Sequence, residues 1–294
     1  MWYDLWEFDF GCDFLKFNDI VLSLEKAGVD SPKYDAQILL EHFCSVRPHE
    51  LPFIGEKDFG SAELADAVKK RADRYPLQYI IGSWSFMTEE YEVNEDCLIP
   101  RSDTELLVET AIKMLPERAS FIDLCTGSGC VAISTLAARR DCRATAVDLF
   151  PKTLDLAKRN AQKNKVADRF SPILADVLAA PSEEIISRAP FGAILSNPPY
   201  IQSHVVKALS PEVKFEPEAA LDGGSDGLDF YRAILKFYTP LLSPDGFFAF
   251  EIGYDQGQGL QHLASKHGFC CEILSDLSSN DRVAVLKKSY GGTL

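Results

Sequence analysis

Four consecutive residues, Asn197-Pro198-Pro199-Tyr200, combine hydrogen-bond acceptors with a flat aromatic ring. Two adjacent prolines remove two backbone N–H donors and stiffen the chain, which leaves carbonyl groups free to accept. Asn197 adds a side-chain amide oxygen as a further acceptor. A planar NH2 group has two donors that these acceptors could hold together, while the Tyr200 ring could stack on its plane. The motif indicates a site for an amide or amine nitrogen; a stiff Pro-Pro loop with an Asn turn is the alternative.

A second candidate site is the glycine-containing loop Asp123-Leu124-Cys125-Thr126-Gly127-Ser128-Gly129, which joins a strand-like segment to a helix-like one. Glycines allow a tight turn and close approach of a ligand. The helix start behind them offers free N–H groups. Asp148 ends the next strand-like segment, where its carboxylate could accept hydrogen bonds from both hydroxyls of a ribose.

Two ligand classes fit this loop. Residues 127–132 match the G-x-G-x-x-G/A fingerprint, with Asp148 suitably downstream, and this would indicate an NAD-dependent oxidoreductase. S-adenosylmethionine fits as well, because Asp123 could hold its cationic amino group, whereas the same carboxylate would repel a pyrophosphate. The charge argument favours the methyl donor by only about two to one. A glycine turn without a ligand is the third interpretation.

Strand-like and helix-like segments alternate from Ser120 onward, which is typical of an α/β fold with a doubly wound, mostly parallel sheet. The last two strands are joined by a short turn and should pair antiparallel. The carboxyl ends of the strands in such a sheet line the ligand crevice, where Asn197 and the glycine loop both fall. The expected strands are 121–124, 144–147, 172–174, 193–196, 247–252, 270–274 and 283–286, and the expected helices include 129–139, 151–164, 228–241 and 257–267.

The N-terminal quarter of the chain instead follows a helical period. Helices are expected over about 14–27, from Ser31 with Pro32 in its first turn, and from near Ser61. Residues 76–98 hold short strand-like pieces at 79–81 and 91–93. The sequence thus predicts a helical domain over 1–75, a linker or hairpin over 76–98, and an α/β domain over 99–294 whose first helix starts at a capping box of Ser102 and Glu105.

Composition and charge exclude several classes of protein. The chain has 294 residues, of which 46% are hydrophobic, yet no run reaches the ~18 apolar residues that span a bilayer. Residues 1–13 lack the basic and apolar regions of a signal peptide, so a cytoplasmic protein is expected. The net charge of −14 argues against direct nucleic-acid binding, with Lys69-Lys70-Arg71 interpreted as a solvated helix face. The cysteines show no zinc-site spacing, and no metal is expected.

Further segments, together with Asn-Pro-Pro-Tyr, resemble the HemK/PrmC family of protein-(glutamine-N5) methyltransferases. They are PLQYIIG (76–82), LIPRSDTE (98–105), FEP (215–217) with ALDGG (220–224), DGL (226–228) and EIG (251–253). The resemblance implies a class I, Rossmann-like methyltransferase domain with a seven-stranded, mostly parallel sheet and a small N-terminal helical substrate-recognition domain. It also implies S-adenosylmethionine as cofactor and methyl transfer to the glutamine amide in the Gly-Gly-Gln loop of class I peptide chain release factors.

The resemblance also assigns roles to individual residues. It implies catalytic roles for Asn197, Pro198 and Tyr200, with Pro199 and Arg101 as further substrate-binding residues. The cofactor-binding residues that it implies are Cys125, Thr126, Gly127, Ser128, Gly129, Asp148, Asp176 and Val177. Asp123 is added by the charge argument above, and Asn197 is expected beside the cofactor.

The chain departs from the family at Cys125, where glycine is usual, and at Ser102, where proline is frequent. Because a positive φ is costly for cysteine, we expect an ordinary backbone at Cys125 and a thiol turned from the cofactor. Alternative functions are adenine-N6 methylation of DNA or RNA, which needs base flipping and a basic surface, and glutamine methylation of a ribosomal protein. An NAD-linked oxidoreductase and an inactive binding module leave the Asn-Pro-Pro-Tyr motif unexplained.

Overall fold

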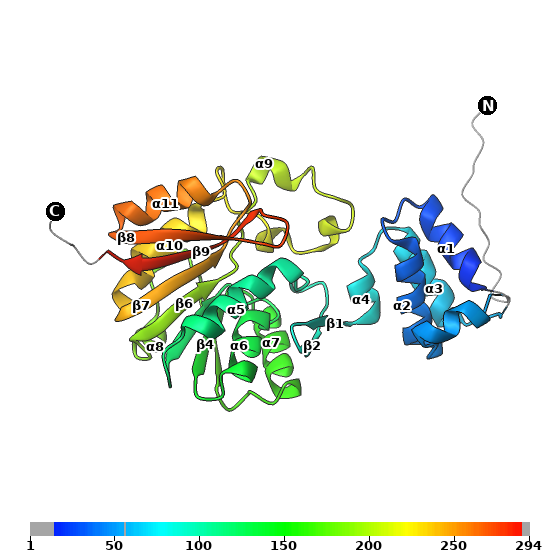
Figure 1. The fold of residues 1–294 in the computed structure, drawn as a ribbon, viewed down its shortest axis with the longest axis horizontal. Helices are drawn as coiled ribbons and strands as arrows, with labels where there is room; N and C mark the ends of the chain where they lie inside the picture. The colour runs from blue at the N-terminus through cyan, green and yellow to red at the C-terminus, as the bar shows by residue number, and fades with distance from the viewer. Residues whose placement is uncertain (1–14, 56, 290–294) are drawn as a thin grey trace. The chain divides into compact units, whose positions relative to one another are not determined.

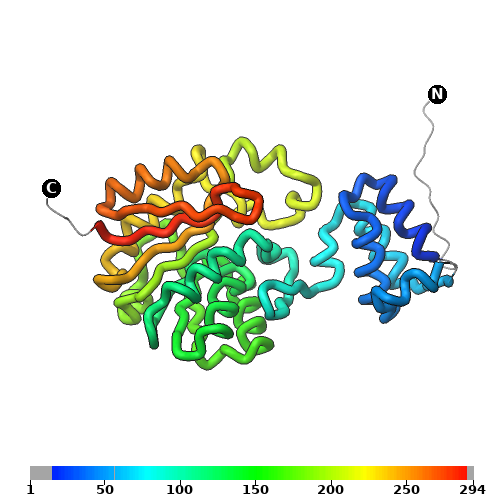
Figure 2. Tube along the Cα trace, in the orientation of Figure 1, coloured from blue at the N-terminus to red at the C-terminus, as the bar shows by residue number. Residues whose placement is uncertain are grey.

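The structure is a computed structural model that describes residues 15–55 and 57–289. The described residues divide into two compact units, those up to 82 with 211–215, and 83–210 with those from 216 onward. Figures 1 and 2 colour the chain from blue at the N-terminus to red at the C-terminus. Phe14 and the stretch 1–13, on which the signal-peptide argument depended, lie outside the described residues.

The first unit is helical, as the apolar period predicts (Figure 1). Ser61 begins its third helix by accepting the Leu64 N–H at 3.1 Å, so the expected start there is confirmed. A single apolar core joins the helices, and Ile20, Leu24 and Leu40 are fully buried in it. The helices are α1 (Phe17–Lys26), α2 (Pro32–Cys44), α3 (Ala62–Ala72) and α4 (Leu77–Ile81), with the 3-10 helix η1 (Pro48–Phe53).

The strand expected at 79–81 is wrong, because this stretch belongs to helix α4. Leu77 is buried in the helical core, and Ile80 and Ile81 pack against it. A short apolar run is compatible with a strand or with a buried helical turn, and here the neighbouring helices decide. Gly82 then ends the helix with a positive φ of 73°.

The cluster Lys69-Lys70-Arg71 does not form one solvated face. Lys70 is exposed and pairs with Asp66 across one helical turn at 2.8 Å. Arg71 is buried, and its guanidinium donates to Asp35 at 2.6 Å and to Glu212 at 3.1 Å. Position 71 lies three and seven residues after Val68 and Leu64, which face the core, so it shares their side of α3. The solvated interpretation is therefore wrong for Arg71.

The second unit contains the predicted seven-stranded sheet, in the order β5-β4-β3-β6-β7-β9-β8. Strands β3 to β7 run parallel, and β9 pairs antiparallel with both β7 and β8, as expected for the last two strands. The strands are β3 (Ser120–Leu124), β4 (Arg143–Asp148), β5 (Phe170–Leu174), β6 (Phe191–Ser196), β7 (Leu242–Glu251), β8 (Phe269–Ser275) and β9 (Asp281–Lys288). A separate hairpin consists of β1 (Ser83–Phe86) and β2 (Glu89–Glu92).

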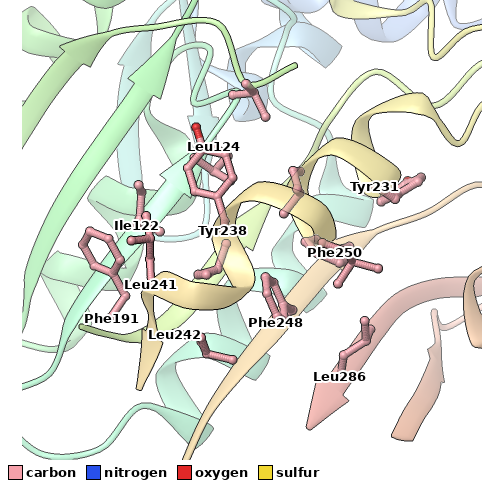
Figure 3. Packing of buried hydrophobic residues seen from close by; sticks show 14 of the residues in the cluster. Ile122, Leu124, Phe191, Tyr231, Tyr238, Leu241, Leu242, Phe248, Phe250 and Leu286 are labelled. Atoms are coloured by element: carbon pink, nitrogen blue, oxygen red, sulfur yellow. The ribbon is translucent and has the colours of Figure 1, made fainter. Parts of the chain in front are cut away.

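Helices and aromatic side chains cover the sheet. In Figure 3, Tyr231 and Tyr238 of one helix lie beside Phe248 and Phe250 of β7 and Phe191 of β6, and all five are fully buried. Burial of each such ring contributes roughly 2 kcal/mol. The helices are α5 (Glu105–Met114), α6 (Cys130–Ala138), α7 (Pro151–Lys163), α8 (Glu183–Ile186), α9 (Ser203–Val206), α10 (Asp229–Tyr238) and α11 (Gly257–Lys266), with η2 (Ser102–Thr104), η3 (Val213–Phe215), η4 (Glu218–Ala220) and η5 (Thr239–Leu241).

The predicted capping box before α5 is wrong. Ser102 begins the short helix η2, and no side chain caps either η2 or α5. The Glu105 carboxylate accepts the Met87 N–H at 2.9 Å, so it is engaged by the turn of the β1–β2 hairpin. None of the helices in the described part of the chain is long and apolar enough to cross a bilayer.

Candidate active site

The parallel strands bring their carboxyl ends, and both predicted motifs, to one edge of the sheet. Leu124 at the end of β3 pairs with Val147 of β4 and with Ser196 of β6, so the loops that follow are neighbours. A cavity of about 360 Å³ lies among these loops. The predicted site residues on its wall are Arg101, Cys125, Thr126, Gly127, Ser128, Asp148, Asp176, Val177, Asn197 and Pro199.

Asp148 presents its carboxylate to the cavity from the end of β4. Its two oxygens accept the Gly127 N–H at 3.0 Å and the Phe150 N–H at 3.1 Å, which fixes the carboxylate and leaves lone pairs for a ligand. Burial raises the pKa of Asp148, and these backbone hydrogen bonds oppose the rise. Leu149, Phe150 and Leu178 line the same cavity with apolar surface. Hydroxyl groups of a ribose beside an aromatic base match this set of groups.

The backbone at Cys125 contradicts our expectation, because its φ is +58°. The turn that leaves β3 imposes this conformation: the Thr126 N–H donates to Val147 at 2.9 Å, and the Thr126 hydroxyl donates to Asp123 at 2.6 Å. Surrounding contacts can hold a non-glycine residue in this costly region. Cys125 forms part of the cavity wall while packing against the central core. Burial raises the pKa of its thiol well above the usual range.

Asp123 and Gly129 lie behind the cavity wall. Asp123 is only 1% exposed, and its Oδ1 is buried without a hydrogen-bond partner in the described part of the chain. Burial raises the pKa of its carboxyl group to about 7. Gly129 has a φ of +84°, and a Cβ there would lie 2.7 Å from Ile133 Cδ1. Both residues therefore support the loop from within the fold.

Asn197 reaches the cavity wall in a defined orientation. Its side-chain NH2 donates to the Thr104 hydroxyl at 3.1 Å, which leaves the amide oxygen as the free acceptor. Pro199 also lines the cavity, whereas Pro198 is buried behind it. The Tyr200 side chain is not part of the wall either, because its hydroxyl donates to Glu251 Oε1 at 3.2 Å. The structure thus brings Asn197 and Pro199 to the cavity wall, while Glu251 holds the hydroxyl of Tyr200.

Arg101 lies on the cavity wall and is held by a buried acid that the sequence analysis did not single out, Glu216. The Arg101 guanidinium pairs with the buried Glu216 carboxylate, whose second oxygen accepts the Ile99 N–H at 3.1 Å. Burial raises the pKa of Glu216, and the Arg101 charge opposes the rise. Thr104, the partner of Asn197, was missed as well. The signal for Thr104 and Glu216 was present in the segments 98–105 and 215–217, which the sequence analysis used only as parts of the family resemblance.

No group of histidine, cysteine or acidic side chains that could hold a metal ion occurs within residues 15–55 and 57–289. The cysteines that the structure describes are free thiols: Cys44, Cys97, Cys125, Cys130, Cys142, Cys270 and Cys271.

Comparison with known proteins identifies the family. Residues 17–82 match the model of the PrmC N-terminal domain, and residues 102–214 match that of the methyltransferase small domain. A methyltransferase structure from Pyrococcus furiosus, 16% identical, superimposes with a TM-score of 0.52 over 69% of this chain and 91% of that chain, which shows the fold alone.

Two curated relatives, both named release factor glutamine methyltransferase, align along nearly their whole length. The Moorella thermoacetica protein is 36% identical over 271 residues, which cover 90% of this chain and 94% of that protein. The Cereibacter sphaeroides protein is 37% identical over 268 residues, which cover 88% and 92%. The chain therefore belongs to the release factor glutamine methyltransferase family.

Proposed function

We propose that this protein transfers a methyl group from S-adenosylmethionine to the side-chain amide nitrogen of the glutamine in the Gly-Gly-Gln loop of class I peptide chain release factors. The observation that carries the proposal is the Asn197 amide oxygen, held as a free acceptor at the wall of a cavity that also contains Asp148 and the glycine loop. The names of the aligned relatives support a glutamine of a release factor as the substrate.

The residues of the cavity fit the methyl donor. The loop Thr126-Gly127-Ser128 would surround its methionine part, Asp148 would accept from the ribose hydroxyls, and Asp176 with Val177 would lie beside the adenine. A Cβ at Gly127 would meet nothing within 4 Å, so the backbone there is open to a ligand. The Asp123 Oδ1, which has no hydrogen-bond partner among the described residues, lies directly behind the loop, where a nearby cationic amino group would favour the ionised form of the carboxyl group. When bound, the cofactor supplies a methyl group made electrophilic by the sulfonium.

The chemical problem is the weak nucleophilicity of an amide nitrogen, whose lone pair is delocalised into the carbonyl group. The protein must position this nitrogen more than activate it. Asn197 Oδ1 and the carbonyl of Pro198, which precedes the wall residue Pro199, would accept from the two amide hydrogens. Acceptors placed there also stabilise positive charge that develops on the nitrogen. The cationic product is acidic enough to lose its proton late, and the described residues that line the cavity include no histidine.

The helical unit would supply a second contact surface for the release factor, because a small substrate does not need a further domain. A Gly-Gly-Gln loop reaches a narrow slot readily, since its glycines carry no side chains. The acidic chain suits a protein partner with basic patches better than it suits bare nucleic acid. We place this reaction in the cytoplasm, without direct nucleic-acid binding by the enzyme.

The decisive experiment measures transfer of a labelled methyl group to a purified class I release factor. The matched control is the same factor with its loop glutamine changed to alanine. We expect label only on the unchanged factor. Equal labelling of the two factors would contradict the proposal, label confined to nucleic acid would support the adenine alternative, and label on a ribosomal protein would redirect the substrate assignment.

A shortened chain tests the role of the helical unit. Helix α4 packs within the helical core, and the second unit starts at Ser83, so the chain should be cut there. A chain that begins at Ser83 should still bind S-adenosylhomocysteine and lose most methyl transfer to the intact factor. Full activity of this chain would show that the helical unit is dispensable for recognition.

A further inference from the structure

Asn160 is a polar residue on the buried face of α7, in the second unit. Most buried residues of this helix are apolar, among them Leu156, Ala157 and Ala161, and Asn160 itself is fully buried. Burial of an amide costs free energy unless its polar atoms find partners. A leucine of similar size would fill the same place without that cost, so the contacts of this amide call for an explanation.

The hydrogen bonds of Asn160 engage both ends of its amide group. Its Oδ1 accepts the Glu92 N–H at 2.7 Å. Its Nδ2 donates to the Glu92 carbonyl group at 3.1 Å and to the Ser128 carbonyl group at 2.9 Å. These contacts need one acceptor and two donors at the end of a short side chain, which asparagine supplies and which an aspartate or a leucine would not.

The two partners of Asn160 belong to different parts of the second unit. Glu92 is the last residue of β2 and does not line the cavity, whereas Ser128 is a wall residue of the glycine loop. Strand β2 lies beside α7 (Figure 1). Helix α7 also packs on the loop directly, since a Cβ at Gly129 would lie 3.3 Å from Ala157 Cβ. Asn160 thus connects the β1–β2 hairpin with the cofactor loop.

The hairpin has further anchors that do not reach this loop. Asn164, one helical turn after Asn160, donates to the Glu90 carbonyl group and to the Asn160 carbonyl group, both at 3.0 Å. The Met87 N–H donates to Glu105 of α5 at 2.9 Å. Neither Asn164 nor Glu105 lines the cavity. These anchors therefore separate the attachment of the hairpin from the support of the cofactor loop.

We propose that Asn160 is a positioning residue for the cofactor site, which holds the Ser128 carbonyl group, and with it the glycine loop, against the β1–β2 hairpin. The inference rests on the proposed function, in which Thr126-Gly127-Ser128 surrounds the methionine part of the cofactor. A loop that is already held in place loses little conformational freedom when the ligand binds. Asn160 therefore acts on the affinity for the cofactor and leaves the transfer step to the substrate loop.

The same connection has a consequence for the unaltered protein. A bound cofactor restrains the glycine loop, and Asn160 passes this restraint to the Glu92 N–H, outside the cavity. Hydrogen exchange at Glu92 should therefore become slower when S-adenosylhomocysteine binds. Any ligand of the folded state also slows exchange that depends on global unfolding. The Met87 N–H, held by Glu105, measures this general effect, so the informative quantity is the extra protection at Glu92.

The test compares Asn160→Ala with Asn164→Ala, both in the full chain. Each variant removes one amide from α7 and one donor to a carbonyl group of β2, and alanine is compatible with a helix. Only Asn160→Ala also removes the donor to Ser128. Calorimetry gives the Kd for S-adenosylhomocysteine, methyl transfer to the release factor at saturating cofactor gives kcat, and urea titration gives the stability of each variant.

We expect the Kd of Asn160→Ala to rise roughly five- to tenfold, as for loss of one hydrogen bond that preorganises the site. The Kd of Asn164→Ala should stay within about twofold of that of the unaltered protein, and kcat of both variants within about threefold. A merely structural role would lower the stability of both variants and leave the Kd of the folded protein unchanged. In the unaltered protein, the cofactor product should slow exchange at Glu92 at least about threefold more than at Met87.

An unchanged Kd in Asn160→Ala would overturn the inference, and so would a loss confined to kcat. If this variant does not fold, the exchange measurement on the unaltered protein decides, and equal protection at Glu92 and Met87 would overturn the inference. If the unaltered protein binds S-adenosylhomocysteine but methylates no release factor, the proposed function is wrong. The Kd values then still decide whether Asn160 positions the cofactor loop.

Discussion

The cofactor side and the substrate side of the cavity are constructed differently. On the cofactor side, Asp148 and Gly127 stand on the wall themselves, and one hydrogen bond of 3.0 Å joins them. On the substrate side, Pro198 and Tyr200 are not among the wall residues, and Asn197 depends on Thr104 for its orientation. A motif can thus act directly through its side chains or through a backbone that other segments hold in place.

The support of the substrate side comes from the segments 222–228 and 251–256. Gln256 donates to the carbonyl groups of Tyr200 at 2.9 Å and of Gly227 at 3.1 Å. A Cβ at Gly223 would lie 2.7 Å from the Pro199 carbonyl oxygen, so these two backbones are in direct contact. These segments touch the loop from behind, which explains why they accompany Asn-Pro-Pro-Tyr in the sequence.

The largest effect is expected at the substrate wall. Asn197→Ala removes the free acceptor, and turnover should fall about a hundredfold or more, as on loss of a preorganised hydrogen-bonding group. The measurement is single-turnover methyl transfer at saturating cofactor. A native rate in this variant would refute the positioning mechanism.

On the cofactor side, Asp148→Ala should act mainly on binding. Loss of a charged acceptor costs about 1.5–3 kcal/mol, which corresponds to roughly a ten- to hundredfold increase in the Kd for S-adenosylhomocysteine. Calorimetry measures the Kd, and Asp155→Ala, at an exposed acid of α7, is the matched control. If both variants bind equally well, Asp148 does not hold the cofactor.

The support behind the loop can be broken without touching the cavity wall. A Cβ at Gly227 would lie 2.3 Å from the Tyr200 carbonyl oxygen, so Gly227→Ala should displace the loop and lower kcat by about tenfold or more. Gly268 has a similar positive φ, 78° against 74°, but a Cβ there would meet nothing within 4 Å. Gly268→Ala therefore controls for backbone strain. Equal kcat values for the two variants would show that the contact with Tyr200 is unimportant.

The last prediction concerns the stability of the fold and not its activity. The raised pKa of Asp123, about 7, means that the folded protein retains a proton that the unfolded chain releases near pH 4, so this group stabilises the fold at low pH. That contribution is lost as the pH rises to 7. Asparagine at position 123 does not titrate, so the Asp123→Asn variant lacks this loss of stability. Between pH 4 and pH 8, the free energy of unfolding of the variant minus that of the unaltered protein should increase by on the order of 3 kcal/mol. Urea titrations of both proteins without ligand measure the difference, and parallel pH curves would contradict a buried, protonated Asp123.

The local sequence pattern was sufficient to predict the sheet, most of the helices and the positions of the two motifs. Alternating strands and helices define a parallel sheet, and such a sheet places every strand-end motif at one edge, so Asn197 and Asp148 could be expected to meet. Even the antiparallel pairing of the last strands followed from the length of the turn between them. These inferences depend only on residues near one another in the chain.

The features that the sequence analysis did not predict depend on contacts between residues far apart in the chain. The helix at 77–81 and the buried Arg71 depend on the helical core and on an acid as remote as Glu212. The positive φ of Cys125 depends in part on a carbonyl group of the neighbouring strand, that of Val147. Asn197 finds its partner 93 residues away, and Tyr200 finds its own 51 residues away. The orientation of a short polar side chain depends on which donor or acceptor faces it, and only the folded chain brings those groups together.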